Sequence, residues 1–198
     1  WPELLAVLRR KTELAGDADV QRALLRKQAE ICELRLENRA EAIRAHEAIL
    51  ELGFDREAAL ALERLYAAEG RWDDLASLLE AQLPIDGSDV ADLHFRLGSV
   101  AMDHLGDQDR ALEHFRAVLE VLPDHAPTVA KLEALGSREG FAAPTAVMLE
   151  PIYRARMDTP KLIGALEARI AGAEEHALQA AVALDQREAG AQEGRVVA

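Results

Sequence analysis

The chain has 198 residues, of which 49% are apolar and 30% charged, and it carries a formal net charge of −13 with a pI near 4.9. A negative balance of this size, with no basic stripe to offset it, disfavours nucleic acid and anionic membranes as partners. Aromatic residues make up only 4% of the chain, while the helix formers Ala, Leu, Glu and Arg dominate, so the composition favours an all-α protein.

The cysteine content and the hydropathy pattern exclude further classes of protein. Cys32 is the only cysteine, so it cannot form an intramolecular disulfide or a thiolate metal cluster, which fits a reducing compartment such as the cytoplasm. No apolar run reaches the ~20 residues that a membrane-spanning helix needs. The first residues lack the basic-then-apolar order of a secretory signal. Because the chain starts without Met and within a repeated phrase, we expect it to be a piece of a longer protein.

A short phrase recurs three times, with leucines at helical spacing after its first residue. Its copies are Trp1, Leu4 and Leu8; Trp72, Leu75 and Leu79; and Thr159, Leu162 and Leu166. The two later copies share a lead-in, which is Leu62, Glu63, Leu65 and Tyr66 in one and Leu149, Glu150, Ile152 and Tyr153 in the other. Such self-similarity indicates stacked structural units rather than one globular core.

Helix pairs account for the chain as far as residue 125. Residues 1–15 predict a single helix, and residues 22–55, 56–89 and 91–125 each predict an antiparallel helix pair. The clearest pair has apolar stripes on both sides of a turn at Gly106 and Asp107 and ends at Pro123. The pairs begin about 34 to 35 residues apart.

This period and several packing residues resemble the tetratricopeptide repeat. The 91–125 unit has small and large residues at the family's packing positions, with one extra residue in the turn between its helices; these are Leu97, Gly98, Ala111, Phe115 and Pro123. The other units are more degenerate, and His46 takes a position where the family has Phe. The resemblance implies a right-handed α-α solenoid over residues 1–189, with about 10–11 helices.

The repeat pattern is disturbed after Pro123. Residues 126–142 predict one inserted helix, and residues 143–176 predict a further pair whose helices cover about 144–157 and 160–171. Pro151 lies within the first of these and could bend it. A last helix is expected from Glu174 to about Ala189, in which residues 177–189 predict a half repeat, and residues 190–198 predict a disordered tail.

The sequence offers little chemistry for catalysis or metal binding. The histidines at 94, 104, 114 and 125 lack the spacing of a zinc motif, and solvated helix surfaces explain them best. Cys32 lies beside Ile31 on an apolar stripe, so we expect it to be a small core residue. We expect the His46 ring to be partly buried and to fill space between helices. Carboxylate pairs such as Asp73 and Asp74 are typical of helix starts. We therefore expect no enzyme, no cofactor and no metal.

The resemblance also implies where a partner would bind, because this family uses the first helix of each pair to line a concave groove. The residues at those positions are Arg26, Lys27, Glu30, Arg64, Phe95, Arg96, Ser99 and Asp103. Phe95 beside Arg96 is the pair expected to contribute most, since aromatic residues and Arg are enriched at binding hot spots. The predicted function is a scaffold that binds a peptide or protein segment. Two alternatives stay open: a spacer that dimerises through exposed terminal helices, and a regulatory module of a larger protein.

Overall fold

The computed structural model describes residues 1–85 and 89–196, and its side chains are described up to residue 179 apart from residue 176. Every regular element in this part of the chain is a helix. The chain divides into two compact units, Trp1–Ser88 and Asp89–Ala198. The prediction of one uninterrupted array over residues 1–189 stays a prediction.

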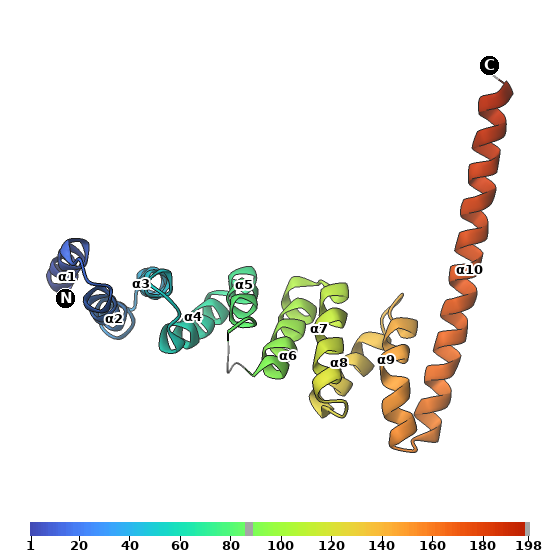
Figure 1. Ribbon diagram of the computed structural model, residues 1–198, viewed down its shortest axis with the longest axis horizontal. Coiled ribbons are helices and arrows are strands. Elements are labelled where there is room, and N and C mark those ends of the chain that lie inside the picture. Colours follow the sequence, from blue (N-terminus) through green and yellow to red (C-terminus); the bar gives the residue numbers. More distant parts are fainter. Residues whose placement is uncertain (86–88, 197–198) are drawn as a thin grey trace. The chain divides into compact units, whose positions relative to one another are not determined.

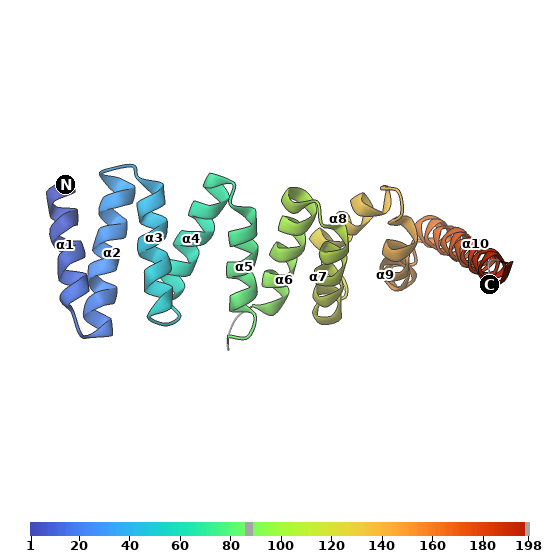
Figure 2. The ribbon, with the colours of Figure 1, turned by 90° about the horizontal axis from the view of Figure 1, so that it is seen from above.

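The first unit contains α1 (Pro2–Leu14), α2 (Ala18–Leu34), α3 (Arg39–Glu51), α4 (Arg56–Glu69) and α5 (Trp72–Gln82). Each helix packs on the next one in the chain, so that α1 to α5 lie side by side in order (Figures 1 and 2). Part of the core forms where Leu25, Ile49 and Ala58 meet from three successive helices. Cys32 is fully buried, as its apolar surroundings predicted.

The second unit contains α6 (Val90–Val100), a π-helical turn η1 (Ala101–Leu105), α7 (Gln108–Val121), α8 (Ala126–Gly136), α9 (Ala142–Ala155) and α10 (Thr159–Val196). Its core joins residues of all these helices around Phe115, Leu132 and Leu135, which are fully buried. Gly98 faces Phe115 so closely that an added Cβ would lie 2.6 Å from the ring. The predicted all-α solenoid of helix pairs is confirmed.

Acidic and amide side chains fix where many of the helices begin. Asp17, Asn38, Asp55, Asp89 and Asp107 each accept hydrogen bonds from backbone N–H groups of the following first turn. These bonds satisfy donors that have no partner within the helix. The repeated phrase also coincides with helix starts, because Trp1 is the N-cap residue of α1 and Trp72 and Thr159 are the first residues of α5 and α10.

Two kinds of turn join the paired helices. After α4 and α9 the chain closes with a backbone hydrogen bond five residues back, from Arg71 to Tyr66 and from Asp158 to Tyr153. This is the bond of a Schellman ending, and it places Gly70 and Met157 at positive φ. After α2 and η1 the bond spans one residue more, from Asn38 to Cys32 and from Asp107 to Ala101.

The extra residue of the 91–125 unit therefore lies in the helix and not in the turn, which corrects the sequence interpretation. Inserting one residue into an α-helix produces a π-helical turn. In this chain that turn is η1, where residues 101–105 absorb the insertion before the chain turns at Gly106.

The end of the chain differs from the prediction in two places. The expected break between Ala171 and Glu174 is absent, and α10 continues through residues 190–196, which were predicted to be disordered (Figure 1). Residues 197–198 lie outside the described part. Gly172 is a packing residue and not a helix breaker, because an added Cβ would lie 2.3 Å from the Cβ of Ala143 on α9. The helix α9 also continues through Pro151.

Candidate functional site

The exposed face of α2 forms one wall of a hollow in the first unit. Arg26, Glu30, Glu33 and Leu34 line it from α2, and Glu57 and Ala58 line it from the start of α4. His46 and Ile49 of α3, the helix between these two in the chain, complete the lining. The hollow has a volume of about 310 Å³. Helices α2 and α4 are the first helices of two successive predicted pairs.

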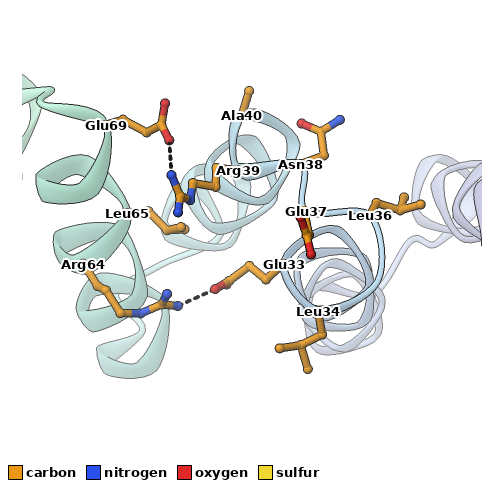
Figure 3. A pocket seen from close by; sticks show the side chains of 10 residues that line it. All are labelled: Glu33, Leu34, Leu36, Glu37, Asn38, Arg39, Ala40, Arg64, Leu65 and Glu69. Carbon is orange, nitrogen blue, oxygen red and sulfur yellow. Dashed lines mark hydrogen bonds and ion pairs between the residues drawn. The ribbon is translucent and has the colours of Figure 1, made fainter.

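A larger hollow of about 810 Å³ adjoins the first one, because Glu33 and Leu34 line both. Its other walls are the turn after α2, the first residues of α3 and the second half of α4 (Figure 3). The lining residues from these walls are Leu36, Glu37, Asn38, Arg39, Ala40, Arg64, Leu65 and Glu69. We call the two hollows together the α2–α4 groove.

Ion pairs cross the α2–α4 groove and hold its walls together. Arg64 of α4 donates to Glu33 of α2, and Arg39 of α3 donates to Glu69 of α4 at 3.1 Å, so that each pair points across the hollow in Figure 3. At the other end Arg26 of α2 donates to Asp55, the N-cap of α4, at 2.5 Å. Every guanidinium group in the lining is thus bound to a carboxylate.

Glu33 lies at the centre of the groove and is held in its charged form. Burial alone would raise its pKa, but hydrogen bonds from Arg64 and from the Nε2 atom of His46, 3.1 Å away, lower the pKa below its ordinary value. The same balance applies to Asp55, where burial is outweighed by the Ala58 backbone N–H and by Arg26, so that its pKa is also lowered. Carboxylates stabilised in this way are weak proton acceptors.

The outer rim of the groove combines charge with exposed apolar surface. Leu34 is 66% exposed although it is a large apolar residue, and Glu30 and Glu37 are exposed beside it. Leu34 also belongs to both hollows, so an apolar side chain of a partner that enters either hollow can reach it.

The structure brings together only part of the predicted site. Arg26, Glu30 and Arg64 line the α2–α4 groove, while Lys27 is exposed on α2 outside the lining residues. The other predicted residues belong to the second unit. Phe95 packs on Phe115 and lies edge-on to His125, with ring centroids 5.2 Å apart, so it is a core-facing residue rather than a free hot spot.

The remaining predicted residues of the second unit are engaged or half-buried. Arg96 lies 3.6 Å from Asp92 on its own helix, and Asp103 pairs with Lys131 of α8. Ser99 is half-buried, and its Oγ has no hydrogen-bond partner among the residues whose side chains are described. The sequence reasoning missed Leu34, Glu37, Arg39 and Glu69; an apolar residue on the otherwise polar face of α2 was the available signal for Leu34.

Three of the four histidines predicted to be solvated are half-buried, which corrects that prediction. His94 and His114 face each other with their Nδ1 atoms 3.0 Å apart, and burial lowers the pKa of His94. His125 lies 2.8 Å from Thr128 as well as beside Phe95. Only His104 is exposed. Periodicity could not show this, because the helix that covers each ring comes from elsewhere in the chain.

Metal and thiol chemistry find no support in the described residues. No group of three or more His, Cys, Asp or Glu side chains among them is placed to hold a metal ion. Burial raises the pKa of the Cys32 thiol, which keeps it protonated and unreactive. None of the described helices is both long and apolar enough to cross a membrane.

Comparison with known proteins agrees with the repeat interpretation. Residues 58–91 match the family model described as tetratricopeptide repeat, a match that begins within α4 and includes all of α5. Among solved structures, the crystal structure of MamA is similar at 15% identity, covering 86% of this chain and 89% of that chain with a TM-score of 0.43. No curated protein matches the chain. The tetratricopeptide repeat prediction is confirmed for residues 58–91, and this match supports a protein-interaction scaffold in general.

Proposed function

We propose that this chain is a non-catalytic scaffold that binds a peptide or an extended protein segment in the α2–α4 groove. The observation that carries the proposal is the pair of adjoining hollows between two successive first helices, with the exposed Leu34 shared by both. The matched repeat includes most of α4, so one wall of the groove belongs to the segment that resembles an interaction module.

The geometry favours binding over catalysis. The ion pairs Arg64–Glu33 and Arg39–Glu69 span the walls, so the groove is formed before a ligand arrives and little ordering entropy is lost on binding. The lowered pKa of Glu33 makes it a poor general base. Exposed apolar and charged groups side by side are what a peptide ligand uses for affinity and orientation.

A displayed peptide library, selected against the full chain, tests this proposal. We expect enriched peptides to protect α2 and α4 from amide hydrogen exchange and to bind at least about tenfold more weakly to a Leu34→Asp variant. Leu34 is already exposed, so this change leaves the core intact. The matched control is Leu14→Asp, which alters another exposed leucine, 70% exposed at the end of α1.

Two results would remove the groove as the binding site. One is enrichment of peptides that bind Leu34→Asp as well as they bind the unmodified chain. The other is protection that falls only on helices outside α2 to α4. Circular dichroism of each variant confirms that a change in binding is not a loss of folding.

A second candidate function is self-association, because α10 exposes an apolar stripe. Ile163, Leu166 and Ile170 follow one another at helical spacing and are 51%, 36% and 61% exposed. On α1, Trp1, Leu4 and Val7 form another exposed stripe. Exposed stripes of this kind favour helix–helix contact between copies. Sedimentation velocity over a range of concentrations tests it: a dimer that disappears in Ile163→Ser/Ile170→Ser supports it, and a monomer at every concentration opposes it.

A further inference from the structure

The positive charges of the α2–α4 groove are already used within the protein. Arg26, Arg39 and Arg64 are bound to Asp55, Glu69 and Glu33 respectively. A guanidinium group bound to a carboxylate has little free potential to attract an acidic ligand, and breaking the pair would expose a charge that the protein now satisfies.

At the rim of the groove, in contrast, there are exposed glutamates that are not used in ion pairs with the described side chains. Glu30 and Glu37 are exposed, and within the part of the chain whose side chains are described neither forms an ion pair. Glu57 is 84% exposed and lies 3.8 Å from Arg26, which already binds Asp55 more closely. Besides the paired Arg26, the opposing charges nearby are Lys27 on α2 and Arg35 just after it; both lie outside the lining residues of the two hollows, and Arg35 lies over the ring of Trp1.

Leu34 lies between the two free carboxylates along the chain. Glu30 and Leu34 are one helical turn apart, a rise of about 6 Å, and Glu37 follows in the turn after α2. Alternate side chains of an extended peptide point to one side and are about 6.6 Å apart. An extended ligand can therefore place a side chain near each of Glu30, Leu34 and Glu37 if it has the order basic, any, apolar, any, basic.

We infer that the ligand of the α2–α4 groove is an extended segment with a basic residue on each side of an apolar residue. The apolar side chain packs on Leu34, and the basic side chains pair with Glu30 and Glu37. This inference rests on the proposed function and adds the chemistry of the partner. The net charge of −13 favours the same class of ligand, because it steers cationic segments toward the protein.

Fluorescence anisotropy with three labelled peptides and the full chain tests the inference. The first has the core Arg-Ser-Leu-Ser-Arg, the second replaces both arginines by Glu, and the third replaces the leucine by Ser. We expect the first to bind at least about tenfold more tightly than either of the others. Its affinity should fall as salt is raised, since the paired charges are exposed.

A double variant tests whether Glu30 and Glu37 pair with the basic residues of the peptide. Glu30→Gln/Glu37→Gln should weaken binding of the basic peptide about fivefold or more and reduce its salt dependence. The matched control is Glu3→Gln/Glu51→Gln, which removes the same charge from two other exposed glutamates and should change the affinity little.

Two further outcomes would overturn this inference alone, and a third would overturn the proposed function with it. If the acidic peptide binds more tightly and loses affinity in Leu34→Asp, the groove binds peptides and the inferred chemistry is wrong. If the basic peptide binds equally well to both double variants, Glu30 and Glu37 are not its partners and the inference fails. If no peptide of the three binds and the library enriches none, both the inference and the proposed function fail.

Discussion

The α4–α5 hairpin of the first unit and the α9–α10 hairpin of the second are built on the same positions of the repeated phrase. In each, a tyrosine near the end of the first helix donates its hydroxyl to a glutamate of the preceding helix: Tyr66 to Glu47 at 2.7 Å, and Tyr153 to Glu133 at 2.9 Å. A cation lies over each ring, Arg71 in the first and Lys161 in the second. The repeat thus conserves a polar contact between helix pairs as well as an apolar core.

The two hairpins differ in how they satisfy a buried glutamate. Gln82 of α5 donates an amide hydrogen bond to Glu63 at 2.9 Å, whereas Arg154 and Arg169 bind Glu150 at the corresponding place. They differ also at the left-handed position of the turn, where the first has Gly70 and the second has Met157. The comparison teaches that the backbone and the contact are retained while the residue types change.

The largest predicted effect concerns the buried glutamates. Arg169→Leu should destabilise the second unit by roughly 2 kcal/mol, because it removes one guanidinium from a carboxylate that is 11% exposed. Gln82→Leu should cost the first unit roughly 1 kcal/mol, because it removes a neutral donor. Amide hydrogen exchange followed by mass spectrometry measures the stability of α4 and the stability of α9 separately in the full chain. Equal losses in the two units would contradict the proposed difference between the pairs.

The next effect concerns the hydrogen bond to a glutamate that both tyrosines make. Tyr66→Phe and Tyr153→Phe should each destabilise their own unit by about 1.5 kcal/mol, since both remove a hydrogen bond to a charged acceptor. Burial, together with the bond to glutamate, raises the pKa of both hydroxyls. A raised pKa in the folded state means that this stability is present below the ordinary value of ~10 and is lost at higher pH. Urea unfolding at neutral and alkaline pH should show that loss in the unmodified chain and a smaller one in the variants.

Substitutions at the left-handed position of the turn should change the stability of the two units in opposite directions. Met157→Gly should stabilise the second unit by about 1 kcal/mol, because a side chain at positive φ is strained, and Gly70→Ala should destabilise the first unit by a similar amount. Gly70 has room for a Cβ, whose nearest neighbour would be 3.8 Å away, so the effect comes from the backbone alone. Both tryptophans lie in the first unit, so their fluorescence reports Gly70→Ala, while hydrogen exchange in α9 reports Met157→Gly. A stabilising Gly70→Ala would show that the turn does not control the hairpin.

The smallest predicted effect is the loss of stability in acid that comes from Glu133. A hydrogen bond from Lys161, at 2.6 Å, lowers the pKa of Glu133. A lowered pKa in the folded state means that this stability is present above the ordinary value of ~4.3 and is lost as the pH falls through the folded value. Because Glu133 is partly exposed, we expect the contribution to stay below about 1 kcal/mol. Urea titrations at falling pH should show a smaller acid loss in Glu133→Gln, and an unchanged acid loss would rule out this contribution.

Sequence periodicity predicted the local elements well. The helix pair expected within residues 56–89 is α4 (Arg56–Glu69) and α5 (Trp72–Gln82), because apolar spacing, capping residues and Gly70 act within one turn of where they stand. The same reasoning failed at Gly172, where contact with α9 outweighs the low helix propensity of glycine. For Phe95 the resemblance implied a position in the groove, and it gave no information on the ring contacts that this residue makes with Phe115 and His125.

The amino-acid sequence by itself determined that this protein is built of helix pairs, that residues 58–91 resemble a tetratricopeptide repeat and that one phrase marks three helix starts. Those properties follow from interactions between residues a few positions apart. Only the tertiary structure decided which charges are free. Arg26 and Arg64 were expected from the resemblance to line a binding groove, and folding pairs both of them, as well as Arg39, with carboxylates about thirty positions away, leaving Glu30 and Glu37 exposed. Charge pairing across helices depends on distances in space, and the linear sequence does not contain them.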